Sequence, residues 1–307
     1  MEIHELIVIL GPTATGKTAF AVKVAHALNG EIISADSRQV YRGLDIGTGK
    51  DLSEYDLNGV QIPYHLIDIL NPGEAYNAFK FKSDAIAAAV DIETRKHIPI
   101  ICGGTGLYIE TLLLDYLFNP AKQNEEFRNS VADYDNSKLA EEIDKLGGIL
   151  SDEDKCNHHR LIRRLEVLKY PGRKENDQEP LVINKLFVFG IDYPREIIRQ
   201  RISSRLESRL QNGMIDEVKA LIDSGVSLSW LNSLGLEYRY ISRFLNNDIS
   251  YQDMYRQLET AIHQFAKRQS TWFRRMEKRG IKIDWIDGYA DDDSKLNFVF
   301  EKTGFGK

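Results

Sequence analysis

The segment that most constrains the fold of this chain is LGPTATGKTAF, residues 10–20. Residues 11–18 have the G-x-x-x-x-G-K-[ST] spacing of a phosphate-binding loop, a motif that requires a buried strand before it and a helix after it. Both are indicated here. Residues 5–10, ELIVIL, form a continuous apolar run, and apolar residues recur at helical spacing through residues 21–28. We therefore predict a strand–loop–helix unit that binds a phosphate group.

Further strands and helices alternate along the first hundred residues. EIISADS (31–37), YHLIDIL (64–70) and IPIIC (98–102) have the composition of strands, and an alanine-rich helical pattern covers residues 77–96. Alternation of this kind is typical of a parallel α/β sheet, in which ligands bind at the carboxyl ends of the strands. We expect the phosphate loop to meet the ends of the other strands at that edge.

The pattern changes after residue 115. Polar helical segments and the breaker-rich stretch YPGRKENDQEP replace the strands, which return at LFVFGI (186–191) and IKIDWI (281–286). We predict an α/β fold with a P-loop nucleoside-triphosphate-hydrolase-like parallel-sheet core. The core is expected to comprise residues 1–115 and 185–307, and residues 116–184 to form a helical insertion.

The composition is that of a globular protein of the reducing cytoplasm. The chain has 307 residues, a net charge of −6 and two cysteines, and no apolar run approaches the ~18 residues that span a bilayer. The start, MEIHELIVIL, lacks the basic segment of a signal peptide. Basic residues cluster at 160–174, 195–209 and 267–282, which suits either a polyanion-binding surface or solvated helix faces. We expect a cytoplasmic monomer without membrane association.

The phosphate loop alone does not identify the reaction. In such loops backbone N–H groups surround phosphate oxygens, the lysine (here Lys17) adds a positive charge, and the next hydroxyl (here Thr18) holds Mg²⁺. A nucleotide hydrolase also needs an acidic residue at the end of a later strand. The strand IPIIC ends instead in Gly-Gly-Thr (103–105), and Asp68 is only a weaker alternative ligand. This favours a transferase that binds a phosphorylated donor over an ATPase.

Asp36 lies at the polar end of the second predicted strand, followed by Ser37. A carboxylate at this position can accept a proton from a nucleophile that attacks the group carrying the phosphate. Aspartate and serine also cap turns and helices, which is the alternative interpretation. Because the predicted sheet brings Asp36 close to the phosphate loop, catalysis is slightly favoured.

Five segments, in order along the chain, together resemble the tRNA dimethylallyltransferase family of the bacterial type, the tRNA A37 isopentenyltransferases. They are GPTATGKT (11–18), ISADSRQVYRGLDIGTGK (33–50), YHLIDILNPGEAYNAFKF (64–81), GGTGLYI (103–109) and FAKRQSTWFRR (265–275). The second segment is far more specific than the phosphate loop, and the resemblance covers most of the chain.

The resemblance implies a particular reaction. Such an enzyme transfers a dimethylallyl group from dimethylallyl diphosphate to N6 of adenine 37 in tRNAs that read codons beginning with U, with Mg²⁺ as cofactor and the tRNA anticodon stem-loop as partner. The base is flipped into a channel, and the diphosphate enters from the other end. Asp36 would accept the N6 proton, Thr105 would lie at the adenine, and Arg205 would stabilise the leaving diphosphate.

The resemblance also implies a set of binding residues. The diphosphate-binding residues are Gly11, Thr13, Ala14, Thr15, Gly16, Lys17 and Thr18, with Thr18 as the metal ligand. The tRNA-binding residues are Asp36, Ser37, Arg38, Gln39, Thr105, Arg128, Arg160, Arg163, Lys267, Arg268 and Gln269. Tyr41 and Trp272 suit either base stacking or packing in the protein.

The insertion departs most from the family pattern. It is shorter, and DKCNHHRLIRR (154–164) replaces a His-Pro-Asn-Asp-like stretch before the basic helix, so the part that contacts tRNA is altered more than the catalytic part. Two other activities remain open. One is an adenylate isopentenyltransferase that acts on free AMP, ADP or ATP, and the other is a P-loop small-molecule kinase. A non-enzymatic RNA-binding role is a third, more distant interpretation.

Overall fold

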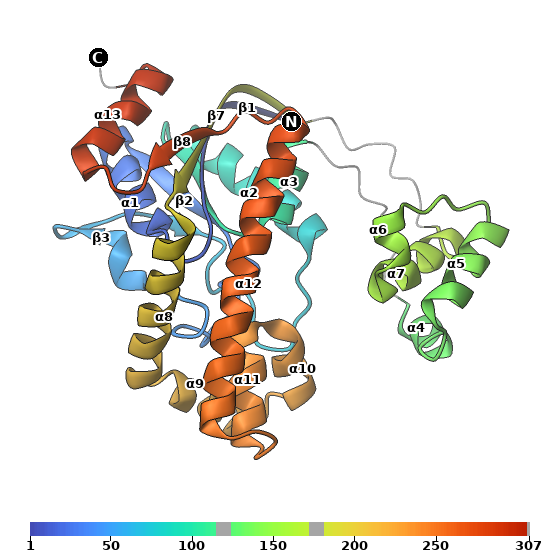
Figure 1. Cartoon of the computed structure of the whole chain (residues 1–307). Helices are drawn as coiled ribbons and strands as arrows, with labels where there is room; N and C mark the ends of the chain where they lie inside the picture. Colours follow the sequence, from blue (N-terminus) through green and yellow to red (C-terminus); the bar gives the residue numbers. More distant parts are fainter. Residues whose placement is uncertain (115–123, 172–180, 306–307) are drawn as a thin grey trace. The chain divides into compact units, whose positions relative to one another are not determined.

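The computed structural model describes residues 1–114, 124–171 and 181–305. The chain divides into two units, which we call the core unit (residues 1–115 and 181–307) and the insertion unit (residues 116–180) (Figure 1). None of the helices in the described part of the chain is long and apolar enough to cross a membrane.

The core unit is built on one six-stranded sheet in which all neighbouring strands are parallel, in the order β5-β2-β6-β1-β7-β8. β1 lies between β6 and β7, and its residues from Leu6 to Leu10 are buried, which accounts for the uniformly apolar sequence. The strands of the sheet are β1 (Glu2–Leu10), β2 (Gly30–Ala35), β5 (Tyr64–His65), β6 (Ile98–Gly103), β7 (Val182–Asp192) and β8 (Asp284–Asp287). The short strands β3 (Asp56–Leu57) and β4 (Val60–Gln61) form a separate antiparallel pair.

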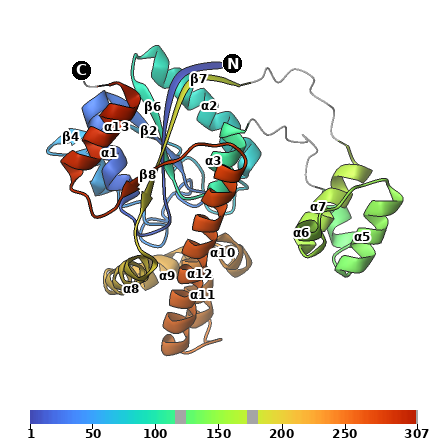
Figure 2. The same ribbon diagram turned by 45° about the horizontal axis from the view of Figure 1, so that its top comes forward.

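Helices cover both faces of this sheet. α1 packs with α13 on one face and α2 packs with α3 on the other (Figure 2). A further layer, α8 to α11 with the first part of α12, lies beyond the carboxyl ends of the strands, and the last part of α12 packs beside α3 (Figure 1). The helices of the core unit are α1 (Lys17–Leu28), α2 (Ala78–Thr94), α3 (Gly106–Leu113), α8 (Arg195–Gln211), α9 (Met214–Asp223), α10 (Leu228–Leu234), α11 (Leu236–Leu245), α12 (Tyr251–Lys278) and α13 (Asp292–Thr303), with a 3-10 turn, η1, at Leu52–Tyr55.

The helical layer has its own apolar core, distinct from the core of the sheet. The helical repeats visible in the sequence supply it: Ile202 and Leu206 on α8 are buried in the same cluster as Leu258 and Ile262 on α12. Side chains from α9, α10 and α11 complete the cluster. This packing fixes α8 and α12 beside the end of the sheet, where the phosphate loop lies.

Several predicted strands have different bounds in the structure. The strand expected over IKIDWI (281–286) begins only at Asp284, where β8 starts. The strand expected over YHLIDIL is wrong beyond His65, because Leu66 (φ 62°) and Asp68 (φ 54°) adopt left-handed conformations that interrupt an extended chain. β7 begins at Val182, which pairs with Glu2, so residues 182–184 belong to the sheet and not to the insertion.

Within residues 124–171, the part of the insertion unit that the structure describes, there are four helices: α4 (Glu125–Ser130), α5 (Asn136–Lys145), α6 (Asp152–Lys155) and α7 (His158–Lys169). Leu139, Ile143, Leu161 and Leu165 form its fully buried centre, which lies between α5 and α7. Each helix follows an Asn, Asp or Ser whose side chain accepts a hydrogen bond from a backbone N–H of the first turn. These caps explain why so polar a segment forms distinct short helices.

Glu31 is a buried carboxylate near the start of β2. Arg95 donates to it from Nε at 3.0 Å and Nη2 at 2.8 Å, and the rings of His65 and His97 lie 2.7 and 2.6 Å from its oxygens. Burial raises the pKa of Glu31, but the hydrogen bonds from Arg95, His65 and His97 outweigh this effect and lower the pKa to about 2. The network joins β2 to β5 and to the turn before β6.

The lowered pKa of Glu31 predicts part of the response of this protein to acid. The unfolded carboxyl has a pKa of about 4.3, so Glu31 contributes stability above that pH and the contribution is lost as the pH falls towards 2. We expect this group to remove up to about 3 kcal/mol of unfolding free energy across that window. Denaturant titrations between neutral pH and about pH 3 measure the loss.

Glu31→Gln is expected to be less stable than the wild type at neutral pH and to lose less stability in acid. Glu301→Gln, which alters an exposed carboxylate with no ion pair among the described residues, is the control and should follow the wild type at every pH. A Glu31→Gln protein whose stability falls in acid as steeply as that of the wild type would contradict the assignment.

Candidate active site

The phosphate loop connects β1 to α1 at the carboxyl edge of the sheet, as predicted. Ala14 (φ 67°) and Gly16 (φ 77°) have left-handed conformations, which curl the loop before α1 begins at Lys17. The Oγ1 atom of Thr15 donates to the carbonyl oxygen of Pro12 at 2.9 Å and closes the loop on itself. This is the backbone geometry that directs N–H groups and a helix N-terminus at an anion.

Two helices from the C-terminal half of the chain hold the loop in place. Gln269 on α12 accepts a hydrogen bond from the N–H of Thr13 and donates to the carbonyl oxygen of Gly104, both at 2.8 Å. Arg201 on α8 donates from Nε to the carbonyl oxygen of Ala14 at 2.7 Å. Gln269 therefore clamps the phosphate loop to the segment that follows β6.

Cations gather beside the loop in a cavity that also contains acidic side chains: Arg209 pairs with Asp51, whereas Lys17 and Arg205 have no ion pair among the described residues. Arg205 on α8 donates to the hydroxyl of Thr13, and burial lowers its pKa to about 10, an effect to which Arg209 adds. Burial also lowers the pKa of Lys17, with a further contribution from Arg205. At neutral pH Arg205 remains charged, so a ligand with phosphate oxygens would relieve the repulsion among these cations.

Asp36 follows β2 directly and lines the same cavity. Its Oδ1 atom accepts a hydrogen bond from the N–H of Arg38 at 2.9 Å, which orients the carboxylate. Its other oxygen accepts no hydrogen bond from the described residues. The neighbouring N–H of Ser37 donates to Oγ1 of Thr105 at 3.2 Å, and the N–H of Thr105 donates to Ala35. The turn that carries Asp36 is thereby fixed to the end of β6.

One cavity of about 90 Å³ adjoins both the phosphate loop and the Asp36 turn. Its lining includes Thr13, Gly16, Lys17 and Thr18 of the loop, Asp36, Arg38 and Gln39 after β2, Cys102 and Gly103 at the end of β6, Arg205 and Arg209 on α8, and Ile262, Phe265 and Gln269 on α12. Cationic donors for phosphate oxygens and a carboxylate base are thus available to one bound molecule. This is the arrangement expected for transfer of a group from a phosphorylated donor.

The side chains of Arg38 and Gln39 are already engaged. Arg38 pairs with Glu237 at 3.0 Å, and its guanidinium lies 5.0 Å from the ring centre of Phe265. The amide of Gln39 accepts from Ser34 at 2.9 Å and donates to Gly49 at 3.0 Å. These contacts fix both residues at the cavity wall, and their role toward RNA stays a prediction.

The other predicted tRNA-contacting residues lie in different surroundings. Lys267 and Arg268 are exposed on α12, whereas Gln269 is buried and occupied by its two backbone bonds. In the insertion unit, Arg128 and Arg163 both bind the fully buried carboxylate of Glu166, and Arg160 pairs with Asp154 at 3.2 Å. Burial raises the pKa of Glu166, but hydrogen bonds led by that from Arg128 lower it to about 2. Arg128 and Arg163 thus have a structural role within the insertion.

Two aromatic residues with alternative interpretations have packing contacts. Tyr41 is buried, its hydroxyl donates to Glu74, and its ring contacts Trp230 edge to face. Trp272 packs against Gly106, and the guanidinium of Arg275 lies 3.9 Å from the centre of its ring. Asp68, the weaker candidate metal ligand, pairs with the buried Lys50 and does not line the cavity.

Several cavity residues were not identified from the sequence. Asp51 and Glu54 line the side near Lys17, and burial raises the pKa of Glu54, with a further contribution from Asp51. Glu237 comes from the start of α11, a helix without a recognisable motif. Arg209 was detectable in principle, because it follows Arg205 by one helical turn and therefore shares its face.

The comparisons with known proteins agree over nearly the whole chain. A family model described as IPP transferase matches residues 39–276. The tRNA dimethylallyltransferase 2 of Bacteroides fragilis is 43% identical over 302 residues, which cover 98% of this chain and 99% of that protein. The tRNA dimethylallyltransferase 1 of Azobacteroides pseudotrichonymphae is 46% identical over 306 residues, 99% of each chain.

Solved structures give the same result for the fold. A tRNA delta(2)-isopentenylpyrophosphate transferase from Staphylococcus epidermidis superposes with a TM-score of 0.70 at 30% identity, covering 98% of this chain and 99% of that chain. A eukaryotic dimethylallyltransferase acting on tRNA gives a TM-score of 0.74 at 23% identity and supports the fold alone. The predicted α/β class and the resemblance drawn from the sequence are both confirmed. The chain belongs to the IPP transferase family, the tRNA dimethylallyltransferases.

Proposed function

We propose that this chain transfers a dimethylallyl group from dimethylallyl diphosphate to N6 of adenine 37 in tRNAs that read codons beginning with U, and releases diphosphate. The observation that carries the proposal is the cavity that Lys17 of the loop, Arg205 and Asp36 line together. Family membership supports this reaction over transfer to free adenylate and over a kinase.

The loop side of the cavity suits a diphosphate leaving group. As the allylic C–O bond breaks, negative charge grows on the oxygen that joined the allylic carbon to the α-phosphorus. The N–H groups of the curled loop, Lys17 and Arg205 are positioned to stabilise that charge. Because Gln269 and Arg201 fix the backbone of the loop, these donors need little rearrangement during the reaction.

The Asp36 side suits proton removal. Adenine N6 is a weak nucleophile that becomes acidic as it forms the bond to the allylic carbon, so a nearby carboxylate accepts its proton. The oxygen of Asp36 that is not bound to the Arg38 N–H is available for this step. Thr105, which holds the N–H of Ser37, keeps the turn in position and lies at the proposed adenine site.

The same cavity offers oxygen ligands to Mg²⁺. The hydroxyl of Thr18 and the carboxylates of Asp51 and Glu54 line it, whereas no group of three or more acidic, histidine or cysteine residues forms a metal site in the described part of the chain. This fits a cation that takes several of its ligands from the diphosphate. Bound there, Mg²⁺ would neutralise part of the diphosphate charge, with Thr18 as the protein ligand.

The acceptor is proposed to be the anticodon stem-loop of tRNA. Arg38 and Gln39 lie at the cavity wall, and Lys267 and Arg268 are exposed on the adjacent helix α12, where they are available to RNA. The insertion unit is proposed to contribute Arg160. The enzyme is proposed to act as a monomer.

A transfer assay with three acceptors tests this proposal. Purified protein is given labelled dimethylallyl diphosphate with an anticodon stem-loop carrying A37, the same stem-loop carrying G37, or AMP. We expect label in the A37 RNA only. Label in AMP but not in RNA would favour the adenylate isopentenyltransferase alternative. Conversion of ATP to ADP with phosphorylation of an added acceptor, in a parallel incubation and without any prenyl transfer, would favour the kinase.

A further inference from the structure

A second cavity of about 680 Å³ lies between the first half of α8 and the middle of α12. Its walls include Arg195 and Arg199 from α8, and His263, Lys267 and Arg274 from α12, with Asp192 as the one carboxylate that lines it. We call it the α8–α12 groove. It does not share lining residues with the catalytic cavity.

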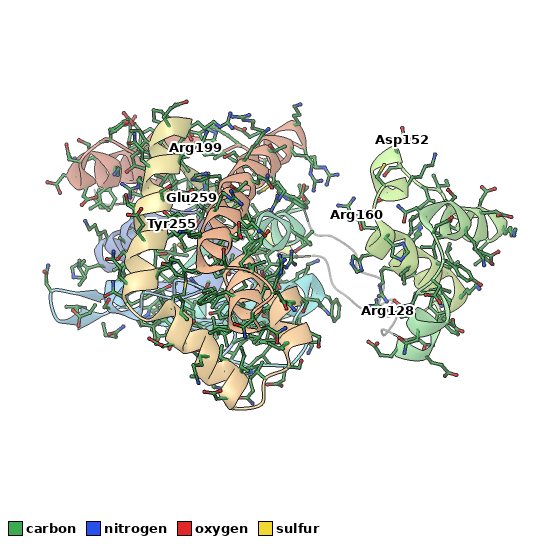
Figure 3. All side chains as sticks on the ribbon, turned by 60° about the horizontal axis from the view of Figure 1, so that its bottom comes forward. Arg128, Asp152, Arg160, Arg199, Tyr255 and Glu259 are labelled. Carbon is green, nitrogen blue, oxygen red and sulfur yellow. The ribbon has the colours of Figure 1, made fainter. Side chains whose placement is uncertain are left out.

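The two helices that form the groove are fixed to one another. Ser203 on α8 donates to Glu259 on α12 at 2.5 Å, and Tyr255 on α12 donates to Glu207 on α8 at 3.2 Å. Figure 3 labels Arg199 on α8 together with Tyr255 and Glu259 on α12. The acidic residues at this helix pair are thus occupied by hydroxyl groups, and the groove has a fixed geometry.

The cations of the groove have no acidic partners. Arg195, Arg199, Lys267 and Arg274 are exposed, and none of their side chains has an ion pair or hydrogen bond within the described residues. Four unpaired cations around one cavity are unexpected in a chain whose net charge is −6. A concentration of uncompensated positive charge of this kind attracts polyanions.

The arrangement fits an extended chain of phosphates better than a single small anion. Arg195 and Arg199 are one turn apart on α8, and Lys267 and Arg274 are seven residues apart on α12, about 10 Å along the helix axis. The charges therefore follow the groove instead of converging on one point. Ser270 and Thr271 line the groove between them, and their hydroxyls donate to carbonyl oxygens of α12 itself.

α12 connects this groove to the catalytic cavity. Gln269 faces the cavity and clamps the phosphate loop, while Lys267 and Arg274 on the same helix face the groove. We propose that the α8–α12 groove binds the sugar–phosphate backbone of the substrate RNA outside the catalytic cavity, with Arg195 and Arg199 of α8 as contacts to which no role was assigned from the sequence. This inference rests on the proposed function, since it takes tRNA as the substrate.

The double variant Arg199→Gln/Arg274→Gln tests the groove. We expect its Kd for tRNA, measured without donor, to rise at least tenfold near 0.1 M salt. The slope of log Kd against log salt should fall by about 1.5 to 2, because two phosphate contacts are removed. The KM for RNA should rise in parallel, while the KM for dimethylallyl diphosphate and kcat at saturating RNA stay at wild-type values.

The double variant Lys96→Gln/Lys295→Gln is the matched control, since it removes two positive charges from other parts of the core unit. An RNA affinity lowered equally in this control would overturn the proposal in favour of a bulk charge effect. An unchanged Kd and salt slope in the groove variant would also overturn it. A selective rise in the donor KM would instead assign the groove to dimethylallyl diphosphate. Wild-type protein that binds tRNA but does not prenylate it would count against the proposed function and not against the groove.

Discussion

Asp36→Asn is expected to lower kcat roughly 10²- to 10⁴-fold, the range for loss of a general base. Asparagine retains an oxygen that can accept the N–H of Arg38, so the turn should keep its conformation while the group that accepts the proton is lost. The Kd for dimethylallyl diphosphate should remain within about twofold of the wild type, since we propose that the residues of the phosphate loop bind the donor. Single-turnover transfer and donor titration measure the two quantities separately.

The matched control for this experiment is Asp216→Asn, which makes the same chemical change at an exposed position on α9. It should have wild-type kinetics. If Asp36→Asn retained near-normal turnover, the base would have to be another group, and Glu54 would become the next residue to replace because it lines the same cavity and burial raises its pKa.

Arg205→Gln is expected to impair donor binding and chemistry together. Arg205 bonds to Thr13 of the loop and supplies charge where the diphosphate departs, so its loss should weaken donor binding and lower kcat by roughly 10²- to 10³-fold. The contrast with Asp36→Asn is the diagnostic result, since only the arginine variant should change the donor Kd. Burial lowers the pKa of Arg205 to about 10, but the group stays charged at the neutral pH of the assay.

The control for Arg205 is Arg256→Gln, which removes a mostly exposed arginine whose ion pair is with Asp253 of the same helix. Its donor Kd and kcat should equal those of the wild type. An Arg205→Gln enzyme that binds the donor normally and loses only kcat would indicate that Arg205 acts in the transition state alone. A normal donor Kd together with a normal kcat would show that Arg205 contributes to neither donor binding nor catalysis.

The sequence predicted those parts of the site that depend on short sequence patterns next to a strand. The phosphate loop and the Asp36 turn each follow a buried strand directly, and parallel strands end at one edge, so pattern and topology together indicated their proximity. Long-range contacts were not accessible in this way. The hydrogen bond between Thr13 and Gln269 joins residues 256 positions apart, and neither a threonine nor a glutamine indicates in the sequence which residue it will contact.

The differences from the predicted fold have similar causes. YHLIDIL has the apolar composition of a strand, but the pairing of Asp68 with the buried Lys50 and two left-handed residues end the strand early. In the insertion unit, arginine-rich sequence suggested RNA contacts, whereas Arg128 and Arg163 neutralise Glu166, a carboxylate that the fold buries completely. Composition reveals which residues carry charge, but not which of them face each other.

The contacts by which Gln269 holds the phosphate loop can form only late during synthesis of the chain. The strand and loop that carry the phosphate motif leave the ribosome first, whereas the loop acquires its support from α8 and α12 only after most of the chain has been made. A nascent chain that lacks α12 contains the complete motif without a finished binding site. A ligand of the phosphate loop is therefore expected to stabilise only the completed fold.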